Sequence, residues 1–255
     1  MKRIVHMLPI PIPTDEYFAR LNSCLLFQNS VSQFLEKLKA FVDYFRNDTS
    51  AKTAVNVAEK MVADISNKER VVDAQSKPLL IEVVYRISAM TIQGEFAQIN
   101  QLLRTIAFEK YRDLDANDLH SLLFLSQTAV ACGLLDVVLR IRKTVGDTEI
   151  FDDVINAVSV LLEKKAQPTE LENLFFAAKN WLCQQELQII GVGFNASWID
   201  DPFFVLNIYI NNKDPKFLAQ TGEALNRFVI DFKERYNITI EDVSIDVCGV
   251  SELIE

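Results

Sequence analysis

The sequence predicts an α+β protein that is mainly helical and ends in a small β-sheet. Apolar residues recur with helical spacing over most of residues 14–185. After residue 186 they alternate at every second position in three separate runs, as in half-buried strands. With only seven Gly and seven Pro in 255 residues, there is little room for long loops. We expect stacked antiparallel helical hairpins followed by a ββαβ module with a three- or four-stranded sheet.

Three parts follow from this pattern. Residues 1–13 are predicted to be an extended arm or an edge strand, residues 14–185 a helical-hairpin domain, and residues 186–255 a small α+β domain. The junction Gln184-Gln185-Glu186 is too short to act as a flexible linker. We therefore expect the second domain to pack directly on the first.

The N-terminal arm contains Pro9, Pro11 and Pro13 at alternate positions. Each proline fixes its own φ and biases the preceding residue away from helix, so this stretch is extended. The apolar run before it, residues 4–8, is a candidate further strand of the sheet. The prolines suit either a ligand for a partner protein or an arm that packs across the domain through its Ile residues, and we favour the second.

The first helices are predicted for residues 14–27, for residues 30–45 and for residues 51–65. Ser30 and Gln33 have the spacing of a capping box, which satisfies backbone donors in the first turn of a helix. Residues 67–70 are polar and are predicted to form a linker.

An internal repeat follows, because residues 85–99 match residues 124–138 in pattern, 39 positions later. An aromatic residue opens each copy, and a glycine, Gly94 or Gly133, falls nine positions further on. Glycine adopts positive φ without steric cost and commonly ends a helix. Each copy is therefore predicted to be a helical hairpin whose first helix ends at its glycine, and a period of this length is typical of helical repeats.

Two more helices are expected before the strands. The first begins near Thr148 and runs to about Lys164. The second begins at Thr169, which together with Glu172 has capping-box spacing. Stacked helices of this kind usually present a concave binding surface.

The C-terminal module is predicted to contain strands at residues 187–198, 203–211 and 243–250, with a helix at residues 214–236. Asp214 and Pro215 form its entry, a capping side chain followed by a proline in the first turn. The first two strands are expected to form an antiparallel hairpin and the third to lie parallel to the second, with the helix over one face. Gly191 and Gly193 leave room for a close approach to one face of the first strand, most simply by a helix.

Charge limits the class of partner. The formal net charge of −9 repels nucleic-acid phosphates, which disfavours direct DNA or RNA binding. The same charge favours association with a basic protein. No apolar run reaches the roughly 18 to 20 residues of a membrane helix, and no signal-peptide pattern opens the chain, so we expect a cytoplasmic protein without membrane contact. The four Cys residues form no CxxC pair and read as free buried thiols.

Catalytic signatures are missing from the sequence. It contains no phosphate-binding glycine loop, no dinucleotide fingerprint and no nucleophile elbow, and its two His residues, His6 and His120, are too few for a histidine metal triad. We therefore expect no cofactor, no metal and no enzymatic activity. The remaining enzymatic hypothesis is a metal-dependent hydrolase or nuclease that uses carboxylates near the C-terminal strands, namely Asp200, Asp201, Glu241, Asp242 and Asp246.

The hairpin tip between the first two strands is the predicted contact surface. Trp198 and Phe203 flank Asp200 and Asp201, and aromatic anchors beside carboxylates suit a basic partner. The alternative is that both aromatic side chains fold back into the core.

These observations favour a non-enzymatic, cytoplasmic protein-binding protein. Its most concrete form is an acidic immunity or antitoxin-type inhibitor that covers a basic, nuclease-like protein. Two alternatives stay open: the metal-dependent hydrolase or nuclease, and a helical-repeat adaptor or regulator that binds a peptide in its groove.

Overall fold

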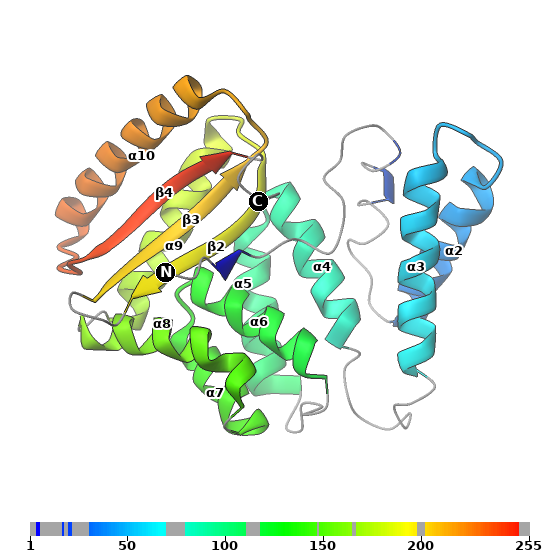
Figure 1. Cartoon of the computed structure of the whole chain (residues 1–255), viewed down its shortest axis with the longest axis horizontal. Coiled ribbons are helices and arrows are strands. Elements are labelled where there is room, and N and C mark those ends of the chain that lie inside the picture. The colour runs from blue at the N-terminus through cyan, green and yellow to red at the C-terminus, as the bar shows by residue number, and fades with distance from the viewer. Residues whose placement is uncertain are drawn as a thin grey trace.

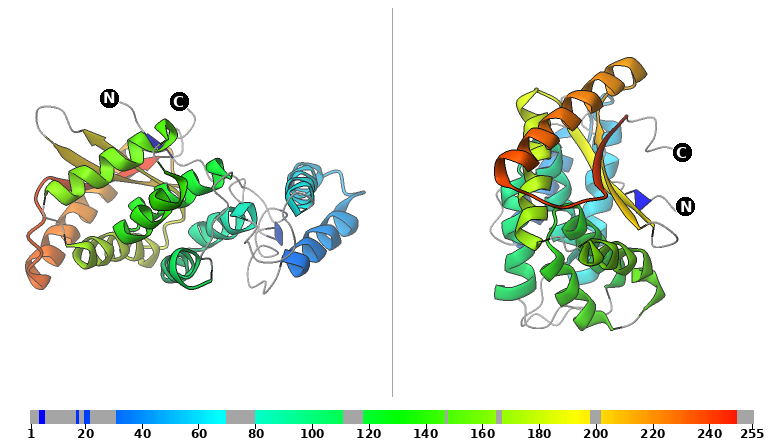
Figure 2. Two further views of the ribbon diagram at one scale, coloured as in Figure 1. Left: turned by 90° about the horizontal axis from the view of Figure 1, so that it is seen from below. Right: turned by 90° about the vertical axis from the view of Figure 1, so that its left-hand side faces the viewer.

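The helices lie to one side of a four-stranded sheet in the computed structural model of the chain (Figures 1 and 2). The structure describes residues 4–5, 17, 20–21, 31–69, 80–110, 118–146, 148–164, 167–197 and 202–249. Eight of the α-helices in these ranges precede the main strands, and one follows the second of them. The predicted class, mainly helical α+β, is confirmed.

From residue 30 on, the helices before the main strands follow the predicted order, and the helix predicted for residues 14–27 lies mostly outside the described residues. Their bounds are α2 Val31–Phe45, α3 Lys52–Glu69, α4 Leu80–Gln93, α5 Phe96–Arg104, the π-helix η1 Thr105–Lys110, α6 Leu119–Ala131, α7 Leu135–Val145, the 3-10 helix η2 Glu149–Phe151, α8 Asp152–Glu163 and α9 Pro168–Gln184. None of these helices, nor any other described one, is long and apolar enough to cross a membrane.

Two predicted helix ends are wrong. Residues 67–69 continue α3 rather than forming a linker, because polar residues do not by themselves end a helix. α9 begins at Pro168, with Gln167 as its N-cap and no side-chain cap hydrogen bond, so the capping box at Thr169 is not formed. Proline suits the first helical position because its missing N–H would have no partner there.

The two predicted hairpins are confirmed as α4–α5 and α6–α7. Gly94 and Gly133 have φ values of 75° and 73°, in the left-handed region. In the first turn, the N–H groups of Gly94 and Glu95 donate to the carbonyls of Thr91 and Met90. The same pair of bonds closes the second turn, and this pattern is a Schellman motif.

Both glycine turns abut α9. A Cβ atom placed on Gly133 would lie 2.6 Å from the backbone nitrogen of Glu172, and one placed on Gly94 would lie 2.9 Å from the Sγ of Cys183. Glu172 and Cys183 are near opposite ends of α9. The two glycine turns of the repeat therefore each make a close contact with α9.

The sheet has the order β1-β2-β3-β4. β1 Ile4–Val5 and β3 Phe203–Ile210 both lie antiparallel to β2 Ile189–Ser197, and β4 Val243–Gly249 lies parallel to β3. α10 Pro215–Tyr236 connects β3 to β4, and the side chain of Asp214 accepts a hydrogen bond from the Lys216 N–H at its start. The predicted hairpin, parallel return and helix cap are confirmed, as is the further strand at the N-terminal end. The prolines of the arm lie outside the described residues.

One face of the sheet packs on the helical layer. The ring of Phe204 lies between those of Phe194 and Phe175, with centroid distances of 5.8 Å on each side, and Phe175 belongs to α9. Gly191 and Gly193 alternate with the inward residues of β2 and so lie on the opposite face. The expectation that a helix packs against these glycines is wrong for the described helices, which lie on the other side (Figure 2).

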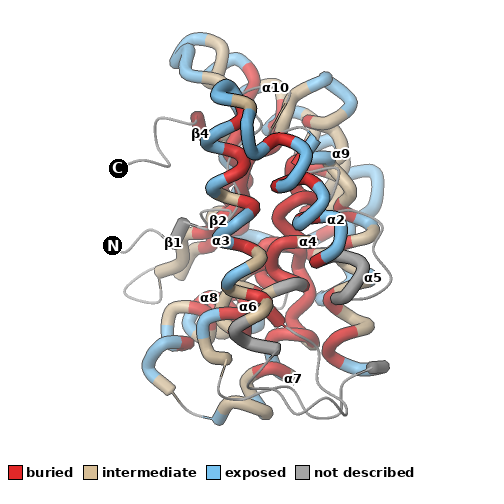
Figure 3. Tube along the Cα trace, turned by 90° about the vertical axis from the view of Figure 1, so that its right-hand side faces the viewer, coloured by how far each residue is buried: buried red, intermediate tan, exposed pale blue. Residues whose placement is uncertain are grey.

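The core is continuous from the helices into the sheet. Buried residues run through the centre of the molecule, whereas the outer sides of α3 and α10 are exposed (Figure 3). The predicted division near residue 185 falls at the end of α9, and the helices before it cover the strands after it.

Candidate functional site

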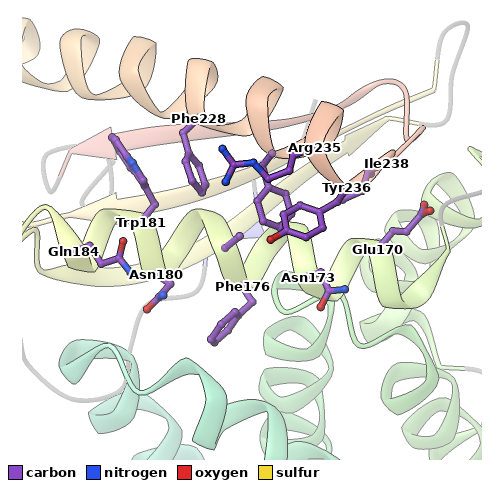
Figure 4. Close-up of a pocket in the computed structure, with 12 residues that line it drawn as sticks. Glu170, Asn173, Phe176, Asn180, Trp181, Gln184, Phe228, Arg235, Tyr236 and Ile238 are labelled. Carbon is purple, nitrogen blue, oxygen red and sulfur yellow. The ribbon is translucent and has the colours of Figure 1, made fainter.

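A groove runs between α9 and α10 on the outer side of the helical layer (Figure 4). Its volume is about 570 Å³, within the range of ligand and peptide pockets. It is lined by residues of both helices and of the turn after α10: Glu170, Asn173, Phe176, Ala177, Asn180, Trp181, Gln184, Phe228, Phe232, Arg235, Tyr236 and Ile238.

Aromatic side chains form a continuous ladder along this groove. Trp181 of α9 stacks on Phe228 of α10, with ring centroids 5.6 Å apart. Phe232 lies 5.9 Å from Phe228, and Tyr236 lies 4.5 Å from Phe232. The three α10 residues are four positions apart, which places them on one face of the helix. Tyr236 is 60% exposed, so the ladder ends in open aromatic surface.

Polar side chains border the aromatic ladder on the α9 side. Asn173, Asn180 and Gln184 each carry both a donor and an acceptor, and Figure 4 shows them along the same helix as Trp181. Glu170 lies at one end of the groove and Arg235 on its α10 wall. An apolar floor with a few polar groups at its border is the usual composition of a recognition site.

A second hollow lies on the other side of α9, against α5. Its volume is about 420 Å³, and it shares Asn173 and Phe176 with the first groove. Arg104 of α5 lies in this hollow, 2.8 Å from a carboxylate oxygen of Asp136 and 2.6 Å from one of Glu172. Burial alone would lower the pKa of Arg104, but the two carboxylates outweigh it and raise that pKa. The charge network therefore joins α5, α7 and α9 at the protein surface, where the Arg104 side chain is 41% exposed.

Lys179 is a buried cation that sequence reasoning missed. It is 1% exposed, and its Nζ donates to the carbonyl of Ala131 at 3.0 Å and lies 3.3 Å from the Sγ of Cys132. The same Nζ lies 5.0 Å from the ring centroid of Phe96. A cation at the last carbonyls of α6 is stabilised by the negative end of the helix dipole. Lys179 therefore anchors α9 at the repeat turn, and its long polar side chain gave no signal of burial.

The predicted contact surface lies mostly outside the described residues. Trp198, Asp200 and Asp201 belong to that part of the chain, so their role stays a prediction. Phe203 opens β3, pairs with Ser197 across the hairpin and is half-buried.

Of the carboxylates in the enzymatic hypothesis, Glu241 and Asp242 precede β4 and Asp246 lies on it. Asp242 precedes this strand and pairs with Lys164 at 2.6 Å, next to Glu241. Asp246 lies further along and is exposed, with Asn207 as its register partner on β3. In the described ranges, no three or more His, Cys, Asp and Glu side chains gather as a metal site would require. Since Asp200 and Asp201 are not described, the full cluster stays a hypothesis.

The described His and Cys residues are His120, Cys132, Cys183 and Cys248. His120 is exposed in the first turn of α6. Cys132 and Cys248 are buried free thiols. Cys183 is half-buried, and burial raises the pKa of its thiol. Cys24 and His6 lie outside the described residues.

Comparison with known proteins gave no relative. No family model matches the chain, and neither the curated proteins nor the solved structures contain a match. Function is therefore argued from the geometry of this molecule alone.

Proposed function

We propose that this protein is a non-enzymatic binding protein that holds a segment of a protein partner in the groove between α9 and α10. The observation that carries the proposal is the open aromatic ladder from Trp181 to Tyr236. Tyr and Trp with a polar border are characteristic of the residues that dominate binding energy at protein interfaces.

The partner is proposed to be basic. A net charge of −9 attracts a positively charged protein over several ångströms and speeds its encounter. The aromatic groove would then supply the short-range contacts, and the overall field would supply the orientation.

In its most specific form, the proposal makes this protein an inhibitor of a basic, nuclease-like enzyme, in the manner of an immunity protein or antitoxin. Carboxylates are suited to this role because they imitate the phosphates that such an enzyme binds. The predicted tip residues Trp198, Asp200, Asp201 and Phe203 would extend the contact beyond the groove.

The groove is tested with a peptide library displayed on phage and selected on the wild-type protein. We expect enriched peptides to carry apolar anchors and basic residues, and to change the tryptophan fluorescence of the protein. Tyr236→Ala should weaken their binding by about tenfold, which is the loss of one aromatic anchor. Tyr44→Ala is the matched control, because Tyr44 is a 78% exposed tyrosine on α2, outside the groove. Equal binding by wild type and Tyr236→Ala would contradict the proposal.

The inhibitor form needs a separate experiment. Wild-type protein and Tyr236→Ala are cross-linked in extract of the native cells, and the partners that only the wild type retains are identified and assayed. A basic enzyme whose activity falls at equimolar protein supports the inhibitor form. Recovery of acidic partners alone, or of an enzyme whose activity is unchanged, would argue against it.

A further inference from the structure

Lys179 of α9 and Cys132, the residue that caps the C-terminal end of α6, lie in contact inside the molecule. We propose that dioxygen cross-links these two side chains covalently through a single oxygen atom, as Nζ–O–Sγ. The pair is then a redox-sensitive modification site that ties α9 to the end of α6. The inference does not depend on the proposed function, because both residues lie outside the α9–α10 groove.

The two reacting atoms are already held together. The Nζ of Lys179 lies 3.3 Å from the Sγ of Cys132, and it also donates to the carbonyl of Ala131 at 3.0 Å. The bond to the carbonyl keeps the amine beside the sulfur. Groups that a fold holds in contact react as if each were present at very high concentration. One oxygen atom is enough to span the gap between this nitrogen and this sulfur.

Both side chains are buried away from solvent. Lys179 is 1% exposed and Cys132 is 2% exposed. Phe96, whose ring centroid lies 5.0 Å from Nζ, is also 2% exposed. An oxidised cysteine sulfur condenses with a nearby nucleophile. Here the Lys179 amine already touches the sulfur, whereas water and soluble thiols are kept outside, so the amine is the group that captures it.

Lys179 has no carboxylate partner to offset the cost of its burial. Within the described part of the chain it forms no ion pair, and its polar contacts are the Ala131 carbonyl and the Cys132 sulfur. Burial of an ammonium group without a carboxylate costs free energy, and the α6 dipole offsets only part of that cost. A methionine of similar length would fill the space without this cost. A reactive role for the amine accounts for a lysine at this position.

The oxidant is dioxygen, because it is small and apolar and enters an apolar core without losing hydrogen bonds to water. One dioxygen molecule takes two electrons from the nitrogen and two from the sulfur. Two N–H bonds of the ammonium group, the S–H bond and the O–O bond break, and an N–O and an O–S bond form. One oxygen atom stays in the bridge. The other leaves as water with two of the released protons, and the third proton goes to solvent.

Thiols reverse the reaction. Two equivalents of dithiothreitol return the four electrons, which restores the amine and the thiol and releases the bridging oxygen as water. While it is intact, the bridge closes a loop between Cys132 and Lys179 and so restricts the unfolded chain. We therefore expect the bridged form to unfold at a Tm higher by about 5 °C or more.

Mass spectrometry of the full chain tests the inference. The protein is reduced under argon and divided, and one half is then exposed to air. In air, the intact mass should gain one oxygen atom and lose two hydrogen atoms, and a protease digest should contain Cys132 and Lys179 in one cross-linked peptide. With isotopically heavy dioxygen, the bridge should carry the heavy isotope. Dithiothreitol should remove both the added mass and the rise in Tm.

Three variants assign the cross-link to this pair. Cys132→Ser keeps an acceptor for Nζ, and Lys179→Met keeps the length of the side chain; each should abolish the cross-linked mass. Cys183→Ser is the control, because Cys183 is a half-buried thiol one turn after Lys179 on α9 and is more open to an oxidant than Cys132. This variant should form the bridge as the wild type does.

Two results would overturn the inference. The first is an air-exposed wild type in which Cys132 is fully alkylated after denaturation, because a bridged sulfur cannot react. The second is oxidation confined to Cys183, with Cys132 and Lys179 unmodified. Both are read from the wild-type chain, so they decide the question even where a variant fails to fold.

Discussion

Backbone conformation at single residues decides how the helices of this protein end. Gly94, Gly133, Glu186 and Asn237 all have positive φ, and each closes a helix with the same pair of carbonyl bonds. The first two are glycines, which adopt this conformation freely. Asn tolerates it, and Glu186 does so with strain. The two glycines also face α9, so they carry a packing requirement in addition to the conformational one.

Replacement of the two glycines by alanine should separate these requirements. In Gly133→Ala the new Cβ would meet backbone atoms of Leu171 and Glu172, which cannot move aside. We expect unfolding free energy to fall by about 3 kcal/mol, from positive φ and overpacking together. In Gly94→Ala the nearest atom is the side-chain sulfur of Cys183, so the loss should be about 1–2 kcal/mol. Urea denaturation measures both, and a larger loss at Gly94 would contradict this account of the turns.

α9 is the element on which the others converge. One side contacts the repeat turns and carries Lys179, which donates to the Ala131 carbonyl. The inner face packs Phe175 against the sheet, and the outer face lines the aromatic groove. At the far end of the molecule, α3 is joined to α4 by a hydrogen bond from the hydroxyl of Tyr85 to Asp64 at 3.1 Å. Because this hydrogen bond is partly buried, the stability that it contributes should depend on pH.

The stability contributed by Tyr85 should fall at alkaline pH. Burial, and next the charge of Asp64, raise the pKa of Tyr85 well above that of an unfolded tyrosine, which is about 10. Because deprotonation then favours the unfolded chain, the contribution is full below pH about 10 and is lost as pH rises further. Tyr85→Phe should cost about 1 kcal/mol at pH 8, for the lost hydrogen bond, and less at pH 10.5. Urea midpoints at both pH values measure this.

An exposed tyrosine serves as the comparison for that experiment. Tyr44→Phe should change the urea midpoint little at either pH, because Tyr44 is 78% exposed. A wild-type advantage over Tyr85→Phe that grows with pH would show that the sign of the shift is wrong.

At the scale of the whole molecule, we expect charge to control how fast a partner associates and apolar contacts to control how slowly it dissociates. The proposed partner is attracted by the net charge of −9, whereas the aromatic ladder makes short-range contacts that salt hardly screens. Raising the salt concentration from 0.05 to 0.5 M should therefore lower the association rate constant by about tenfold and leave the dissociation rate constant nearly unchanged. Stopped-flow measurement of the protein's tryptophan fluorescence with a selected basic peptide gives both rate constants. An association rate insensitive to salt would remove charge steering from the proposal.

The sequence by itself determined the elements and much of their connection. Hydrophobic period and turn chemistry are local properties, so the helices, the glycine caps, the hairpin and the parallel return of β4 could be read from the chain. The helix boundaries at Glu69 and Pro168 did not follow from the sequence, because several cap signals compete within a few residues.

Only the tertiary structure decided which apolar residues stay accessible. Phe228 and Phe232 belong to the same stripe as the buried Leu225 and Val229, and sequence alone assigns all four to the core. The difference depends on tertiary packing, because Phe228 and Phe232 stay half-buried where Phe228 stacks on Trp181, 47 positions earlier in the chain.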